Sequence, residues 1–209
     1  MHSFFIWITL SLTVGFSTFL AYAFLYLKHP QWQYLSAEGS FIEVCSVFVF
    51  SFAALIFFFL FVKTRRIIDF IYTVLMFFAA AREADLHKEW TKDSILKTRF
   101  YLDQEVPLNE KICGLIIIGL LIYCAIQLLK RAPQFISNLL RFHSAALGTS
   151  LALGILFLAK IIDSKDRLPY VDDTFADIDG MYLRLFEESL ELAAALFFMT
   201  VAIMLVRRR

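Results

Sequence analysis

Glycine and proline are scarce in this sequence, with 7 and 4 residues out of 209. Disordered chains are rich in such residues and poor in apolar ones, so long disordered tails are not expected. Charged residues are also few, at 19%, and the formal net charge is only +1. A chain without an overall basic field has no means of attracting nucleic acid, and we expect no nucleic-acid partner.

The familiar catalytic and cofactor motifs are missing as well. The sequence has no P-loop, no dinucleotide-binding glycine fingerprint, no G-x-S-x-G and no H-E-x-x-H. The three cysteines, Cys45, Cys113 and Cys124, show no C-x-x-C spacing and cannot all pair. Cys45 and Cys113 fall at the same predicted membrane face, which leaves two alternatives: a disulfide, or small side chains buried in lipid.

The chain is instead rich in residues with apolar side chains. Hydrophobic residues make up 60% of it, including 24 phenylalanines. A soluble domain is nearer 45–50% apolar, and a water-soluble core of this size has no room for the surplus. The excess must face lipid, so we expect an integral membrane protein with the bilayer as its main partner.

The apolar residues gather into six segments that approach the length of about 20 residues needed to cross a bilayer as a helix. We therefore expect an all-α, polytopic bundle of about six transmembrane helices in a single domain, residues 1–209. The predicted spans are Ser3–Leu27, Ser40–Val62, Ile67–His87, Ile112–Leu129, Ser144–Ile162 and Leu183–Val206.

Basic residues predict the orientation of these spans. One set of ends carries Lys63, Arg65 and Arg66, then Lys130, Arg131 and Arg141, then Arg207, Arg208 and Arg209. Their density is roughly twofold higher than on the opposite side, which by the positive-inside rule makes this side cytoplasmic. Both termini are then cytoplasmic, and the expected location is the cell inner membrane, as a multi-pass protein.

Two connecting segments mix apolar and basic residues, namely 93–102 and 134–142. Each suits a short amphipathic helix lying on the bilayer surface, with Trp90 and Tyr101 as interfacial anchors on the outer side.

Charge interrupts three of the predicted spans close to their outer ends. The stretch before Arg82, which is broken by Asp69, and the uncharged stretches before Lys160 and after Glu191 are only fifteen or sixteen residues long. At 1.5 Å per residue each falls short of the roughly 30 Å of hydrocarbon. The helices must therefore carry these charges below the outer surface, where an ionisable group is expensive and suggests a functional site.

The spacing of the charges predicts a carboxylate-rich metal or cation site. Glu83 and His87 are four residues apart on one helix face, as are Glu187 and Glu191. Carboxylate and imidazole groups together can bind Zn, Mn or Fe, so Glu83, His87, Glu187 and Glu191 are candidate metal ligands. Glu43, Glu83 and Glu188 are candidate catalytic acids or bases, and Arg82 and Lys160 could bind an anionic substrate group.

These residues suit more than one function. The first is a metal-dependent hydrolase or transferase acting on a lipid-borne or other small substrate. The second is a small proton- or cation-coupled transporter, although the cytoplasmic half of the spans is almost uniformly apolar. The third is a non-catalytic membrane subunit or sensor, acting within an oligomer or on a partner membrane protein, in which salt bridges only join the helices.

The segment Arg82-Glu83-Ala84-Asp85-Leu86-His87, with Glu43 upstream and Glu187, Glu188 and Glu191 downstream, resembles a family of bacterial multi-spanning inner-membrane proteins. That family carries an R-E-x-D-x-H signature and has no assigned activity. The membrane hydrolases related to alkaline ceramidases do not fit. They use seven helices and three zinc-binding histidines, whereas the four histidines of this chain are scattered over both faces.

Overall fold

The computed structural model of the protein describes residues 41–84, 86, 98–163 and 180–208. Every regular element within these residues is a helix, which confirms the all-α class for this part of the chain. The predicted first span, Ser3–Leu27, lies outside the described residues. The helices are α3 (Phe41–Thr64), α4 (Ile67–Glu83), α6 (Thr98–Leu102), α7 (Leu108–Leu140), α8 (Ser144–Asp163) and α10 (Gly180–Arg208).

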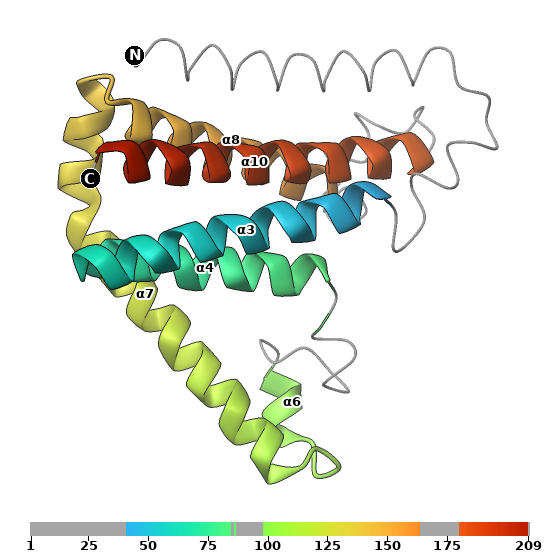
Figure 1. Ribbon diagram of the computed structural model, residues 1–209. Coiled ribbons are helices and arrows are strands. Elements are labelled where there is room, and N and C mark those ends of the chain that lie inside the picture. Colours follow the sequence, from blue (N-terminus) through green and yellow to red (C-terminus); the bar gives the residue numbers. More distant parts are fainter. Residues whose placement is uncertain (1–40, 85, 87–97, 164–179, 209) are drawn as a thin grey trace.

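Four of these helices, α3, α4, α8 and α10, form a bundle (Figure 1). The α3–α4 pair is an antiparallel hairpin closed by Arg65 and Arg66, α8 runs antiparallel to α10, and α10 also packs on α3. The end of α4 thus lies at the same end of the bundle as the start of α10. We call this the Arg82 end, and the opposite end, where α4 begins, the Arg66 end.

The core of the bundle is built from the inward face of each helix. On α3 the buried residues recur every three or four positions, as an amphipathic helix requires, and include Phe50 and Phe57. The Phe57 ring stacks on Tyr72 of α4, with 4.8 Å between ring centroids. Phe198 and Val201 of α10 complete the same core.

Small residues allow α8 and α10 to approach closely. Gly148 and Ala152 of α8 form a small-x-x-x-small pair, and a Cβ built on Gly148 would lie 2.7 Å from Val201. Ala195 and Ala202 on α10 are fully buried. Close backbone approach through small residues is a common way of packing helices in membranes, where the hydrophobic effect between helices is weak.

The outward faces of the bundle remain apolar. Phe48 and Phe59 of α3, for example, are 71% and 68% exposed. Four helices are long and apolar enough to cross a membrane: Phe41–Thr64, Leu108–Leu140, Ser144–Asp163 and Leu183–Arg207. Such lengths, with so much exposed apolar surface, mark a membrane protein in contact with the lipid bilayer.

Five of the six predicted spans fall in the described part of the chain, and four of its helices are long and apolar enough to be spans, so the predicted span at α4 is corrected. Helix α4 is not among the four because it has 17 residues and carries Asp69 in its first turn and Arg82 in its last. Its length is about 25 Å at 1.5 Å per residue, less than the hydrocarbon thickness. The predicted third span, Ile67–His87, extended this helix further, but α4 is capped at Ala84.

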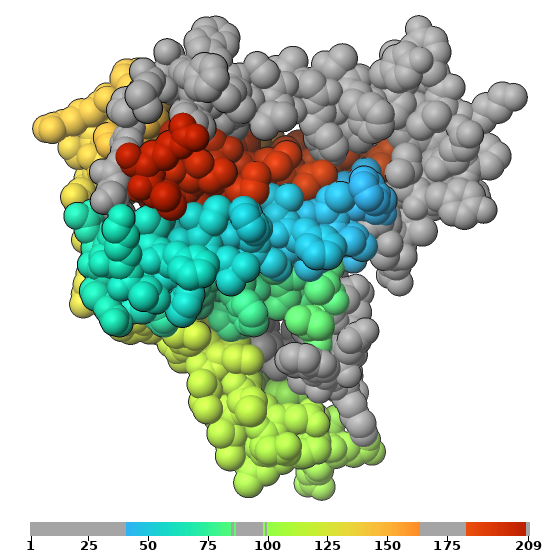
Figure 2. Space-filling view, in the orientation of Figure 1, coloured from blue at the N-terminus to red at the C-terminus, as the bar shows by residue number. Residues whose placement is uncertain are grey.

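Helix α7 is longer than predicted. The sequence favoured a span over Ile112–Leu129 and a separate surface helix over 134–142, but one helix of 33 residues passes through Pro133. Proline removes only one backbone hydrogen bond and bends a helix rather than always ending it. We call the residues of α7 before Pro133 its first part and those from Pro133 onward its second part. The second part crosses the Arg66 end of the bundle (Figure 1), and the first part extends away from the bundle (Figure 2).

The predicted surface helix at 93–102 is described only as the short helix α6. Its Phe100 is fully buried, and a Cβ on Gly114 of α7 would lie 2.6 Å from the Tyr101 hydroxyl. Tyr101 thus packs on α7, and Trp90, the other predicted anchor, lies outside the described residues. The three cysteines are free, so the alternative of a Cys45–Cys113 disulfide is not realised.

Candidate functional site

The Arg82 end of the bundle holds a contact between charges on two helices far apart in sequence. Arg82 of α4 donates a hydrogen bond from Nη2 to Oε1 of Glu191 on α10, at 2.8 Å. Its Nε also lies 3.9 Å from Oε1 of Glu83. The Glu83 and Glu191 side chains are only 9% and 8% exposed, whereas Arg82 is 52% exposed. We call these three residues the Arg82 cluster.

The two carboxyl groups of the Arg82 cluster lie beside the same guanidinium, with Oε1 of Glu191 2.8 Å from Nη2 and Oε1 of Glu83 3.9 Å from Nε. Their mutual repulsion is opposed by a single guanidinium that is half exposed to its surroundings. The geometry therefore favours a further positive charge at this position, whether a proton or a metal ion.

Local helix geometry explains why these side chains point inward. Glu188, Glu191 and Ala195 recur at intervals of three and four residues on α10 and share its buried face. Helix α4 ends immediately after Glu83, so Arg82 and Glu83 are in its last turn. The positive charge of Arg82 is stabilised there because the carboxyl end of a helix carries partial negative charge.

The remaining predicted site residues belong to other pairs. Lys160 forms an ion pair with Asp163, three residues on in α8. Glu188 lies 3.3 Å from Nε of Arg184, four residues earlier in α10. The predicted roles of Lys160 as an anion clamp and of Glu188 as a catalytic acid or base therefore stay predictions.

Glu43 and Glu187 surround the cluster at longer range. Glu43 interacts electrostatically with Glu83 from the first turn of α3. Glu187 interacts with Glu191, Lys160 and Asp163. Carboxylates thus outnumber cations at the described Arg82 end: Glu43, Glu83, Asp163, Glu187, Glu188 and Glu191 face Arg82, Lys160 and Arg184.

The predicted metal-ligand set is only partly described. His87 lies outside the described residues, and Glu83, Glu187 and Glu191 come from two helices. Within the described ranges no group of three or more His, Cys, Asp or Glu side chains lies close enough together to hold a metal ion. Two buried carboxyls, Glu83 and Glu191, are the described groups that could contribute to one. The metal assignment stays a prediction.

Two residues of this region were missed by the sequence analysis, Asp163 and Arg184. The signal was present: Lys160–Asp163 is an i,i+3 pair and Arg184–Glu188 an i,i+4 pair on helices. Either spacing predicts an ion pair within one helix.

Comparison with known proteins adds no identity to this picture: no protein-family model, no curated protein and no solved structure matches the chain. The class that the fold defines is an all-α protein with membrane-crossing helices. The resemblance to bacterial inner-membrane proteins with an R-E-x-D-x-H signature stays a prediction.

Proposed function

We propose that this protein is an integral membrane protein that binds a cation between Glu83 and Glu191 at the Arg82 end of its bundle. The observation that carries the proposal is that two buried carboxyl groups, Glu83 and Glu191, share one half-exposed guanidinium. Buried charge of one sign must be neutralised by a partner, a proton or a metal ion. A divalent metal, Zn, Mn or Fe, is the cation that these carboxylates would suit, together with His87, which follows Glu83 by four residues in the sequence.

The proposal extends to catalysis as a metal-dependent hydrolase or transferase on a lipid-borne substrate. A metal held at Glu83 would activate water, and Arg82, half exposed beside it, could receive an anionic group of the substrate. Glu43, in the first turn of α3, is the carboxylate that would serve as the acid or base for this chemistry. Glu188 forms an ion pair with Arg184, and Lys160 forms one with Asp163. In this proposal both residues lie beside the cation site and do not bind the cation.

The transporter alternative is less well supported. A carrier needs a polar route along the bundle, but the middle of the bundle is occupied by fully buried apolar residues, among them Phe50, Phe57, Ala152 and Ala195. This core separates the Arg82 cluster from the polar residues at the Arg66 end.

The test is elemental analysis of the full chain, purified in detergent without chelator or added metal. We expect stoichiometric metal in the wild type, its loss in Glu83→Gln and Glu191→Gln, and its retention in Glu110→Gln. Glu110 is a matched control because it lies in the first turn of α7, away from the bundle. All three variants should stay folded because each keeps the apolar core.

The competing explanation is that the Arg82 cluster only joins α4 to α10. Arg82→Ala would then be the least stable variant, since it leaves two buried carboxyls without their cation, a loss of about 1–3 kcal/mol. Metal-free wild-type protein together with this ranking in thermal unfolding would refute the cation site and leave the joining role.

A further inference from the structure

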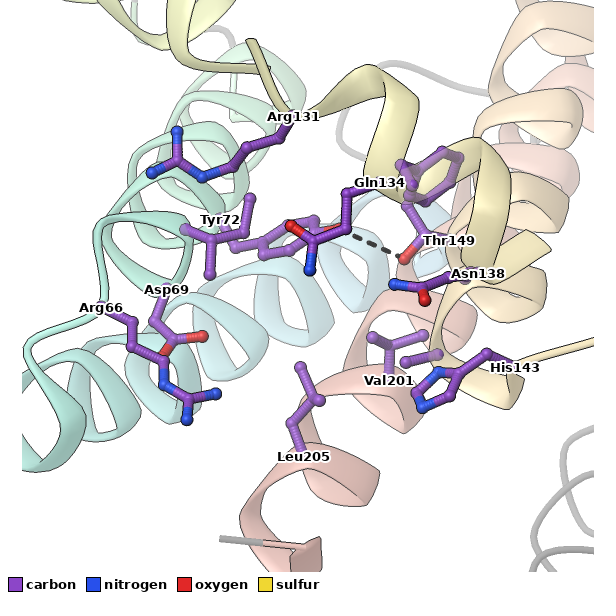
Figure 3. A pocket seen from close by; sticks show the side chains of 14 residues that line it. Arg66, Asp69, Tyr72, Arg131, Gln134, Asn138, His143, Thr149, Val201 and Leu205 are labelled. Carbon is purple, nitrogen blue, oxygen red and sulfur yellow. Dashed lines mark hydrogen bonds between the residues drawn. The ribbon is translucent and has the colours of Figure 1, made fainter. Parts of the chain in front are cut away.

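The Arg66 end of the bundle contains a second polar site, separate from the Arg82 cluster. It is a cavity of about 470 Å³ where the first turns of α4 and α8, the second part of α7 and the last turns of α10 meet (Figure 3). None of its polar residues took part in the site predicted from the sequence. Its polar lining is Arg66, Asp69, Tyr72, Arg131, Gln134, Asn138, His143 and Thr149.

The cavity is rich in hydrogen-bond donors. Gln134 and Asn138 lie one turn apart on α7 and border the same side of the cavity, with His143 beyond them (Figure 3). Arg66 borders it from the opposite side. Arg66 and His143 are exposed, so a ligand entering the cavity can reach both.

Two helices begin at this cavity. Arg66 is the N-cap of α4 and makes no side-chain cap hydrogen bond there, and α8 begins at Ser144, directly after His143. Ile68 in the first turn of α4 and Ala145 in the first turn of α8 line the cavity. Helix starts carry partial positive charge and backbone N–H groups, which add to the attraction for an anion.

The two other charged residues of the lining are already engaged in the protein. The fully buried Asp69 accepts a hydrogen bond of 2.7 Å from Thr64. Arg131 donates to the backbone and side-chain oxygens of Gln127, and its guanidinium is directed toward α4, away from Asn138 (Figure 3). Arg66 is therefore the charged donor that an incoming ligand would meet, and the exposed imidazole of His143 borders the same cavity.

One wall of the cavity is apolar. Phe135 of α7, together with Val201 and Leu205 of α10, lines it next to the polar groups. A ligand that fills the cavity should thus combine an anionic group with hydrocarbon, and the cavity lies at the end of helices long enough to cross a bilayer, where lipid headgroups are found.

We propose that this cavity binds a phosphate ester, with Arg66, His143 and the side-chain amides of Gln134 and Asn138 as donors to its oxygens. Arginine is suited to phosphate because its planar guanidinium can donate two parallel hydrogen bonds. The ester is either the headgroup of a membrane phospholipid or a soluble phosphorylated compound, and both share this chemistry. The site is independent of the cation site at the Arg82 end.

The test measures binding to the full chain in detergent with three probes: dihexanoyl phosphatidic acid, dihexanoyl phosphatidylcholine and inorganic phosphate. We expect saturable binding of phosphatidic acid that is weakened at least about tenfold in Arg66→Gln, the loss of about 1.4 kcal/mol expected for one charge-assisted contact. Arg141→Gln is the matched control, because Arg141 is an exposed arginine at the same end of α7 that does not line the cavity.

A second variant fills the cavity without changing its charge. Ala145→Leu should weaken phosphatidic acid binding while leaving the helices intact, because Ala145 is only partly buried. Binding of phosphatidic acid but not of inorganic phosphate identifies a lipid headgroup, and binding of both identifies a soluble phosphate ester. Absence of binding, equal binding of phosphatidylcholine, or equal weakening by Arg66→Gln and Arg141→Gln would each overturn the proposal.

Discussion

The ion pairs at the Arg82 end differ in the sequence separation of their two partners. Lys160 and Arg184 find carboxylates within one turn of their own helices, whereas Arg82 contacts Glu191 across 109 positions of sequence. Local pairs need no tertiary structure and can be predicted from spacing. The contact between Arg82 and Glu191 depends on α4 and α10 lying close together at this end, so it follows only from the fold.

Two non-glycine residues adopt the left-handed conformation, and both are at helix ends. Arg65 has φ 55° between α3 and α4, and Phe142 has φ 52° between α7 and α8. The Arg65 N–H donates to the Phe61 carbonyl at 2.7 Å, which closes the last turn of α3. Glycine is the usual residue in this position because other residues are strained there.

Arg65 therefore permits a prediction about stability. Arg65→Gly should raise the thermal unfolding midpoint, or leave it unchanged, because it removes left-handed strain of about 1 kcal/mol. Arg65→Val should lower it, since a β-branched side chain fits this conformation poorly. Thermal unfolding of the two variants beside the wild type checks the prediction, and greater stability of Arg65→Val than of Arg65→Gly would contradict the conformation of this turn.

The close packing of α8 against α10 depends on the small size of one residue, Gly148. Gly148 faces Val201, which is 1% exposed and has no room to move aside. Gly154, on the same helix, has nothing within 4 Å of the position where a Cβ would lie. The two glycines therefore provide a matched pair for measuring the cost of close packing.

Gly148→Ala should destabilise the protein by about 1–3 kcal/mol through overpacking, which outweighs the gain in helix propensity. Gly154→Ala should be neutral or stabilising by a few tenths of a kcal/mol to about 1 kcal/mol, since it gains propensity without a clash. Chemical denaturation of both variants in detergent measures the difference. Equal stability of the two would show that α8 and α10 are further apart at Gly148 than the structure places them.

The elements also show what sequence reasoning can and cannot supply. Hydropathy located α3, α8 and α10 to within a few residues because their ends coincide with charges or with glycine. It overestimated α4, because the charges Arg82 and Glu83 were read as lying inside a longer helix that in fact ends at Glu83. It divided α7 at Pro133, because a proline is a boundary in most helices and its neighbours alone do not show that the helix continues.

At the scale of the whole molecule, polar groups are concentrated at the two ends of an apolar bundle. The Arg82 cluster is at one end and the cavity beside Arg66 is at the other, with the buried aromatic core between them. The carboxylates of the first end could be predicted from sequence because they shorten the apolar stretches. The cavity could not, because its residues are scattered over α4, α7, α8 and α10 and meet only in the folded bundle.

Helix α7 allows a test of how this polarity is oriented in the membrane. Its residues before Pro133 alone extend about 38 Å at 1.5 Å per residue, beyond the 30 Å of hydrocarbon. Gln104, just before it, and Arg141, just after it, are both exposed and should lie on opposite sides of the bilayer. The positive-inside rule assigns Arg141 and the Arg66 end to the cytoplasm, and Gln104 and the Arg82 cluster to the outer side.

In a cysteine-free background, Gln104→Cys should react with a membrane-impermeant maleimide added to intact cells, and Arg141→Cys should react only after the membrane is permeabilised. Lys130 and Arg131 remain in the second variant, so the charge bias that sets orientation is preserved. The reverse pattern would place the Arg82 cluster on the cytoplasmic side and the phosphate-ester cavity on the outside. Labelling of both positions in intact cells would show that α7 does not cross the membrane, because residues at the two ends of a crossing helix cannot face the same compartment.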